Sequence, residues 1–191
     1  MRLFIALDID ESIRNRITTF RDQMRRLAPN VRWVDPETFH VTLQFLGETK
    51  KLDEIQHALQ QVICAPLQIA FRGAGFFPNP KSPRVFWVGI DGGAHLQELV
   101  TIVSDSLHPL GFAREPGPYT PHLTLARSGS GRPRPVPDER PAPGLQTVRV
   151  KLETIPPPDF DTMTAHEFFL YQSKLSPAGP RYTKLSRYPL G

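Results

Sequence analysis

The 191-residue chain has a single cysteine, Cys64, and no long apolar segment. One cysteine excludes an internal disulfide and a structural zinc cluster, because both need further thiolates. No stretch approaches the roughly 18 apolar residues that span a bilayer. The opening RLFIALDI is apolar only briefly before Asp8, Asp10 and Glu11, so it lacks the features of a secretory signal. These absences argue against a membrane protein and predict a protein of the reducing cytoplasm.

The composition is otherwise that of an ordinary globular protein. Hydrophobic residues make up 39% of the chain and charged residues 22%, which fits one domain or two small lobes that share a core. The formal net charge of +4 favours an anionic partner. Charge alone does not identify that partner, because an ordinary basic surface gives the same value.

Hydrophobic periodicity and turn residues give the expected order of elements. We expect helices over 10–27, 52–63 and 94–107. We expect strands over 2–9, 39–46, 67–73, 84–90, 121–127, 145–153 and 165–175. Residues 128–144 are rich in glycine, proline and arginine and predict a flexible loop, and we expect an irregular tail over 176–191. Since strands outnumber helices and the links are short, the predicted class is α+β with antiparallel sheets.

Two segments of the chain repeat one pattern. In TFHVTLQFLG, residues 38–47, His40 and Thr42 alternate with apolar residues, and TPHLTLARSG, residues 120–129, repeats this with His122 and Thr124. Residues i and i+2 of a strand share a face, so each histidine lies beside its threonine while the apolar neighbours anchor the strand. The two patterns predict an internal duplication, in which an approximate two-fold axis would bring the histidines together across a cleft.

Two facing imidazoles suit acid–base chemistry at an anion. An imidazole ordinarily titrates near neutrality, so one of the pair could accept a proton while the other donates one. Two threonine hydroxyls could hold an anion between them, and Arg127, five residues after His122, could add a guanidinium if the strand bends or ends there. Such a set is suited to in-line displacement at phosphorus.

Two other interpretations of the histidines are less favoured. A single histidine on a half-exposed strand is usually structural, but a second copy of the whole pattern makes that explanation a poor one for the pair. A catalytic zinc usually has three protein ligands, and neither segment carries His-Glu-x-x-His or a nearby ligand at metal spacing. We therefore expect no metal.

Taken together, these segments resemble the two-histidine phosphoesterase superfamily, and within it the prokaryotic RNA 2′,3′-cyclic phosphodiesterases, also called 2′-5′ RNA ligases. The resemblance covers most of the chain. Besides the two histidine segments, it rests on RLFIALDID, PRVFWVGI and LYQSKLSPAGPRYTKLSRYPL. It implies a duplicated, bilobal fold of residues 1–191, with two antiparallel sheets and outer helices around a central cleft.

The resemblance also implies an activity and the roles of five residues. The activity is metal-independent hydrolysis of a terminal 2′,3′-cyclic phosphate on RNA to a 2′-phosphate, with 2′-5′ ligation as the reverse reaction. By resemblance His40 is the proton donor and His122 the proton acceptor, although the nearly equivalent segments by themselves allow the reverse. Thr42, Thr124 and Arg127 would contact the phosphate. No cofactor is expected, the partner would be an RNA end or a nucleotide, and we expect a cytoplasmic monomer.

A non-catalytic module that binds RNA ends or nucleotides is the alternative to an enzyme. Loss of a histidine would have pointed to it, but both histidines and both threonines are intact. Four aromatic residues, Phe76, Phe77, Phe86 and Trp87, could stack on a base, although such residues more often belong to a core.

Overall fold

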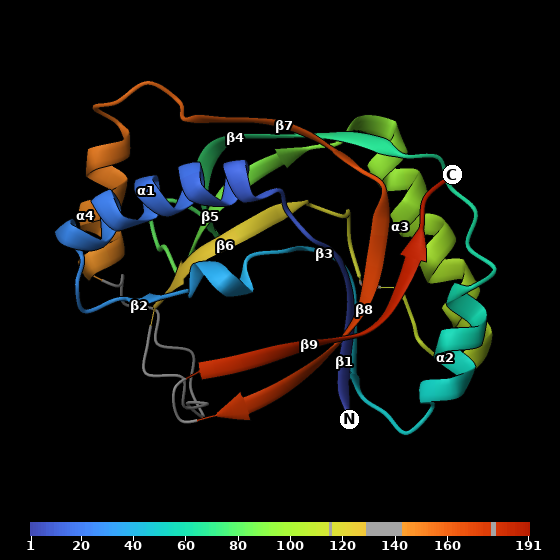
Figure 1. Ribbon diagram of the computed structural model, residues 1–191. Coiled ribbons are helices and arrows are strands. Elements are labelled where there is room, and N and C mark those ends of the chain that lie inside the picture. Colours follow the sequence, from blue (N-terminus) through green and yellow to red (C-terminus); the bar gives the residue numbers. More distant parts are fainter. Residues whose placement is uncertain (115, 129–142, 177–178) are drawn as a thin grey trace.

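The computed structural model describes residues 1–114, 116–128, 143–176 and 179–191 (Figure 1). The helices are α1 (Glu11–Leu27), α2 (Leu52–Leu59), α3 (Gly93–Leu107) and α4 (Pro143–Leu152). The strands are β1 (Arg2–Leu7), β2 (Arg32–Trp33), β3 (Val41–Glu48), β4 (Leu67–Phe77), β5 (Val85–Asp91), β6 (His122–Arg127), β7 (Asp159–Ala165), β8 (Glu167–Ser176) and β9 (Gly179–Pro189).

These strands form two antiparallel sheets, as expected for the predicted α+β class. One sheet has the order β3-β1-β8-β9 and the other has the order β2-β6-β5-β4-β7. Helices α1 and α4 lie together on one side of the molecule and α2 and α3 on the other, as Figure 1 shows. The two histidine strands, β3 and β6, therefore belong to different sheets.

The same unit occurs in both halves of the chain. A strand, a helix and a histidine strand follow one another as β1-α1-β3 and again as β5-α3-β6, and the two strands of each unit pair antiparallel. Each half also supplies a strand to the sheet of the other unit. Strand β4 of the first half pairs with β5 of the second unit, and β8 of the second half pairs with β1 of the first unit. Each sheet is thus completed by two strands from the other half of the chain, β8 and β9 in the four-stranded sheet and β2 and β4 in the five-stranded sheet.

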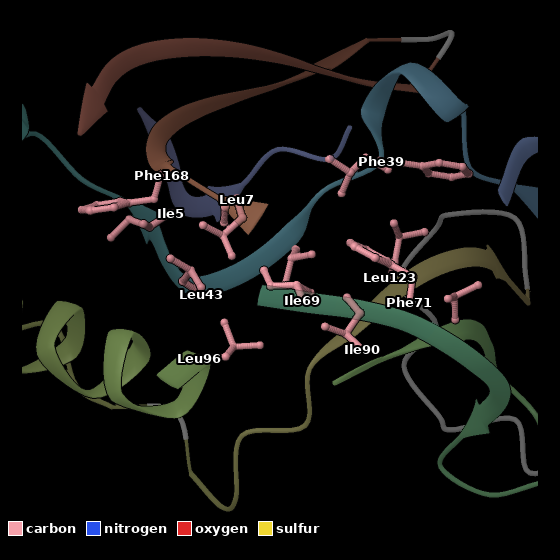
Figure 2. Close-up of a cluster of buried hydrophobic side chains, with 14 of the residues drawn as sticks. Ile5, Leu7, Phe39, Leu43, Ile69, Phe71, Ile90, Leu96, Leu123 and Phe168 are labelled. Atoms are coloured by element: carbon pink, nitrogen blue, oxygen red, sulfur yellow. The ribbon is translucent and has the colours of Figure 1, made fainter. Parts of the chain in front are cut away.

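The sheets and helices share one hydrophobic core. Apolar side chains of both sheets belong to one continuous buried cluster. Figure 2 shows side chains from the two sheets meeting in it, among them Ile5, Leu7 and Leu43 from one sheet and Ile69, Phe71 and Leu123 from the other. Helix α1 adds buried residues at helical spacing, Ile13, Ile17, Phe20 and Met24. The predicted amphipathic pattern of this helix therefore faces the core.

The structure corrects the sequence predictions at three places near the C-terminus. Residues 143–152 form helix α4, where a strand over 145–153 was expected: Leu145 and Val148 are buried at helical spacing, whereas Val150 is exposed. Strand β7 was not expected. The supposedly irregular end forms strand β9, whose exposed polar side chains are typical of a sheet edge and hide the strand in the sequence. Most of the predicted loop 128–144 lies outside the described residues.

Candidate functional site

Both histidines of the repeated pattern are held in the same way. His40 lies immediately before β3, and its Nδ1 is 2.7 Å from the Thr38 carbonyl oxygen. His122 opens β6, and its Nδ1 is 2.8 Å from the Thr120 carbonyl oxygen. A carbonyl oxygen can only accept, so each Nδ1 carries a proton and donates it. This bond fixes the ring and leaves Nε2 as the nitrogen available for proton transfer.

Each histidine strand has a β-bulge just after its threonine. In β3, Thr42 pairs with Ala6 but Gln44 pairs with the adjacent Ile5, so Leu43 is an extra residue. In β6, Thr124 pairs with Trp87 and Ala126 with the adjacent Phe86, which makes Leu125 extra. A bulge shifts the alternation of the strand by one residue.

The bulge in β6 changes the direction in which Arg127 points. Leu125 and Ala126 are both buried, so Arg127 returns to the face that carries Thr124. Arg127 Nη2 lies 3.5 Å from Thr124 Oγ1. The odd spacing between Arg127 and His122 is thereby reconciled with a common face. The equivalent position in β3 is held by Phe45, an exposed aromatic residue.

A cavity of about 340 Å³ connects the two histidine strands. Thr42 of β3 and His122 of β6 both line it. Tyr119, in the segment before β6, closes the outer edge of β3 by donating a hydrogen bond from its Oη to the Thr42 carbonyl oxygen, 2.8 Å away. The structure therefore brings the two strands to one site, with Tyr119 as a link that the sequence did not suggest.

His40 packs against aromatic side chains on one face of the four-stranded sheet. Its ring lies 4.9 Å from that of Phe4 and 5.2 Å, edge-on, from that of Tyr182. Burial lowers the pKa of His40; the bond to Thr38 and the charge of Asp8 oppose this, while the charges of Arg127 and His122 add to it. The pKa of His40 therefore responds to the charges of Asp8, Arg127 and His122. Of the five residues predicted from the sequence, Thr42 and His122 line the cavity described above.

Asp8 is the carboxylate of this site. It accepts hydrogen bonds from Lys184 Nζ at 2.6 Å, from Arg14 Nη2 at 3.0 Å and from the Ile9 backbone at 2.9 Å. Burial alone would raise the pKa of Asp8, but these hydrogen bonds and the charges of Lys184 and Arg14 lower it overall. Asp8 is therefore an ionised group beside His40.

Tyr182 of β9 joins Asp8 among the site residues that sequence reasoning missed. It packs on His40 and interacts electrostatically with Arg127, so it reaches from one sheet toward the other. Burial raises the pKa of the Tyr182 hydroxyl, which stays protonated. In the sequence, Tyr182, Lys184 and Ser186 lie at alternate positions, which is the only local sign of a strand with one functional face. This sign is weak because the segment has no alternating apolar residues.

The aromatic residues singled out in the sequence divide into two groups. Phe76 and Phe86 stack on each other in the core, with ring centres 5.1 Å apart. Phe77 packs edge-on against His122 at 4.9 Å and lies 5.2 Å from Trp87. Only the second group therefore borders the site.

The distribution of acidic, thiol and imidazole side chains bears on metal binding. Within the described ranges, no group of three or more His, Cys, Asp or Glu side chains is placed to hold a metal ion. Among those residues there is also no helix with the length and apolar character needed to cross a membrane.

Comparisons with a family model and with individual known proteins identify the same family. The family model for LigT-like phosphoesterases matches residues 7–87 and again residues 88–182, in agreement with the duplication. The chain is 36% identical to an RNA 2′,3′-cyclic phosphodiesterase of Archaeoglobus fulgidus, with 97% of this chain and 98% of the relative covered. It is 32% identical to a protein of the same name from Methanothermobacter thermautotrophicus, with 100% and 99% covered.

Solved structures agree with the sequence comparisons. A crystal structure of a Thermus thermophilus protein superimposes with a TM-score of 0.78 at 28% identity, covering 100% of this chain and 98% of that one. Escherichia coli LigT, in complex with 3′-AMP, superimposes with a TM-score of 0.75 at 28% identity, covering 99% and 97%. By sequence and by fold, the chain belongs to the LigT-like phosphoesterase family.

Proposed function

We propose that this protein hydrolyses the terminal 2′,3′-cyclic phosphate of RNA to a 2′-phosphate and a 3′-hydroxyl. The observation that carries the proposal is the pair of histidines with Nδ1 bound to a backbone carbonyl, at 2.7 Å for His40 and 2.8 Å for His122. Relatives of nearly full coverage are named RNA 2′,3′-cyclic phosphodiesterases, which supports the same substrate.

In the proposed reaction, His122 accepts a proton from water as the water oxygen attacks phosphorus. The bond from phosphorus to the 3′-oxygen breaks, and His40 donates a proton to that oxygen. After one turnover His122 carries an extra proton and His40 lacks one. Proton exchange with solvent returns both histidines to their starting states. Thr42, Thr124 and Arg127 donate to the non-bridging oxygens, where negative charge accumulates.

The division of roles is supported by an asymmetry between the two units. In the second unit Gly89 pairs with His122. In the first unit the pairing ends at Leu7 and Val41, the residues next to Asp8 and His40. Burial lowers the pKa of His40 overall, and the carboxylate of Asp8 opposes this lowering by favouring the protonated imidazole. This suits His40 as the acid.

The reaction is proposed to need no metal, because the two imidazoles perform both proton transfers. We also propose 2′-5′ ligation, in which a 5′-hydroxyl replaces water as the attacking group in the same displacement, so that it is a parallel reaction and not the reverse of hydrolysis; the high concentration of water opposes it. We further propose that the protein acts as a monomer in the cytoplasm. The single cysteine, Cys64, which is buried and free, supports a reducing compartment.

The test is turnover of an oligoribonucleotide that ends in a 2′,3′-cyclic phosphate, in excess chelator. We expect hydrolysis at an undiminished rate and a 2′-phosphate as product, assigned by phosphorus NMR. Loss of activity in chelator with recovery on adding zinc or manganese would overturn the metal-free mechanism. Binding without turnover would identify the protein as a non-catalytic binding module.

A further inference from the structure

The cavity lined by Thr42 and His122 extends beyond the residues assigned to phosphate chemistry. It is bounded by β3, by α3 and by the chain on either side of Tyr119. Thr42 and His122 contribute to its lining, so a molecule whose phosphate lies at the histidines can continue into it. Its volume of about 340 Å³ lies at the lower end of the range for ligand pockets, roughly 300–1,000 Å³, and suits one small ring system.

Besides Tyr119, whose hydroxyl donates to the Thr42 carbonyl oxygen, two aromatic side chains, Phe45 and Phe77, line this cavity. Phe45 of β3 is 55% exposed, which is unusual for a phenylalanine inside a functional site. Phe77 of β4 is held edge-on against His122. Aromatic side chains beside a phosphate site provide stacking surfaces for nucleobases.

Two buried polar side chains also line the cavity. Gln44 is 3% exposed and Ser104 of α3 is 4% exposed. Gln44 Nε2 donates to the Ala113 carbonyl oxygen at 3.3 Å, which leaves Oε1 as the free end of the amide. Within the part of the chain that the structure describes, Gln44 Oε1 and Ser104 Oγ have no hydrogen-bond partner. Buried polar atoms are usually satisfied, so each calls for a partner of complementary chemistry.

We propose that this cavity binds the nucleobase of the nucleotide that carries the cyclic phosphate, and that Gln44 Oε1 accepts a hydrogen bond from an exocyclic amino group of that base. The proposal rests on the proposed function. Adenine and cytosine present such an amino group beside a ring nitrogen that can accept from Ser104. Uracil presents a carbonyl oxygen at the equivalent position, which would face the acceptor of Gln44.

The experiment compares three small substrates of the full chain: cytidine 2′,3′-cyclic phosphate, uridine 2′,3′-cyclic phosphate and a base-free analogue, 1-O-methylribose 2,3-cyclic phosphate. Cytosine and uracil have nearly the same size, so their comparison isolates the amino group. For the natural sequence we expect a KM that is lowest for cytidine, about 2- to 10-fold higher for uridine and higher again without a base.

The variant Gln44→Leu keeps the size of the side chain and removes the amide. We expect it to bring the ratio of the cytidine and uridine KM values close to one, a change that general structural damage would not produce. Gln68→Leu, at an exposed position of β4 outside the cavity, is the matched control and should preserve the ratio.

Equal KM values for cytidine and uridine in the natural sequence, or an unchanged ratio in Gln44→Leu, would overturn the inference while leaving the proposed function intact. If none of the three compounds is hydrolysed, the inference is overturned. If the oligoribonucleotide with a 2′,3′-cyclic end is not hydrolysed either, the proposed function is overturned with it.

Discussion

At the scale of single residues, Asp8 breaks the symmetry between the two histidines. The duplication makes the histidine segments nearly equivalent, but the carboxylate of Asp8 acts on the pKa of His40, whereas the residue that pairs with His122 is Gly89. Acid and base roles require the two imidazoles to differ in their affinity for a proton. Asp8 supplies a physical source for that difference.

Replacing Asp8 tests this effect on His40. Burial already lowers the pKa of His40, and the negative charge of Asp8 partly restores it. Asp8→Asn should therefore lower the pKa of His40 further. Fewer molecules then carry the acidic proton at neutral pH, and kcat/KM should fall. The measurement is an NMR titration of ¹³C-labelled histidine, with the His40 signal assigned by its loss in His40→Ala.

Asp53→Asn is the control, because this aspartate lies exposed on α2. It should change neither the titration of His40 nor the rate. A pKa of His40 that rises or stays constant in Asp8→Asn would contradict the role given to Asp8.

The residues that the sequence identified are those whose chemistry is visible without knowledge of pairing. His40, Thr42, His122 and Thr124 stand out because alternation and repetition are local patterns. Asp8 and Tyr182 did not, because their closeness to His40 depends on pairing between strands far apart in the chain. Long-range register of this kind cannot be read from one sequence.

At the scale of elements, the bulges in β3 and β6 show what alternation alone misses. With strict alternation, the side chain of Arg127 would lie on the opposite face of the strand from His122. From the sequence, Arg127 was expected at the site only if the strand bends or ends there. The extra residue in each strand is seen only as a shift in register against the neighbouring strand. A strand was expected where helix α4 lies, because a short apolar pattern fits both structures. Val148, Val150 and Leu152 occupy alternate positions, but such a short run is also compatible with a helix, and the packing of the folded chain selects the helix.

The five-stranded sheet depends on a close approach between β4 and β5. A Cβ atom at Gly75 would lie 2.4 Å from the ring of Trp87, whose neighbour across the next ladder is Thr124. Gly75→Ala should therefore displace Trp87 and cost about 1–3 kcal/mol of unfolding free energy, typical of overpacking. Urea unfolding followed by circular dichroism measures this, and the near-ultraviolet signal of Trp87 should change.

Gln68→Ala, on the exposed face of the same strand, should leave both signals near those of the natural sequence. Gly75→Ala should also slow hydrolysis, since Trp87 supports Thr124. An unchanged stability and near-ultraviolet spectrum would show that the ring moves aside at no cost.

At the scale of the whole molecule, the exchange of β4 and β8 between the halves of the chain has a consequence for folding. Neither sheet is complete without a strand from the other half, and one hydrophobic cluster contains side chains of both sheets. We therefore propose that residues 1–191 form a single cooperative domain with two lobes.

This proposal predicts that damage in one sheet is felt in the other. Both tryptophans, Trp33 in β2 and Trp87 in β5, belong to the five-stranded sheet, so fluorescence reports on that sheet. Phe168 is fully buried in the four-stranded sheet, and Phe168→Ala should cost about 3–5 kcal/mol. We expect the fluorescence midpoint in urea to fall by the same amount as the midpoint seen by circular dichroism.

Phe45→Ala in the same sheet removes an exposed ring and should shift both midpoints much less. A fluorescence midpoint that stays constant in Phe168→Ala, while the circular dichroism divides into two steps, would show that the lobes unfold independently.

In the proposed mechanism the two halves of the molecule each contribute one histidine, and each histidine has a distinct task in one reaction. Replacing either histidine by alanine should reduce turnover by roughly 10²–10⁴-fold. The loss alone does not assign the tasks. A substrate in which sulfur replaces the 3′-oxygen does, because a thiolate leaves without being protonated.

The most direct measurement is therefore single-turnover hydrolysis of the 3′-thio analogue of the cyclic phosphate by His40→Ala and His122→Ala. We predict that the analogue restores His40→Ala to near the rate of the natural sequence and leaves His122→Ala impaired. Rescue of His122→Ala instead would reverse the assignment, and full activity of either variant on the natural substrate would remove that histidine from the mechanism.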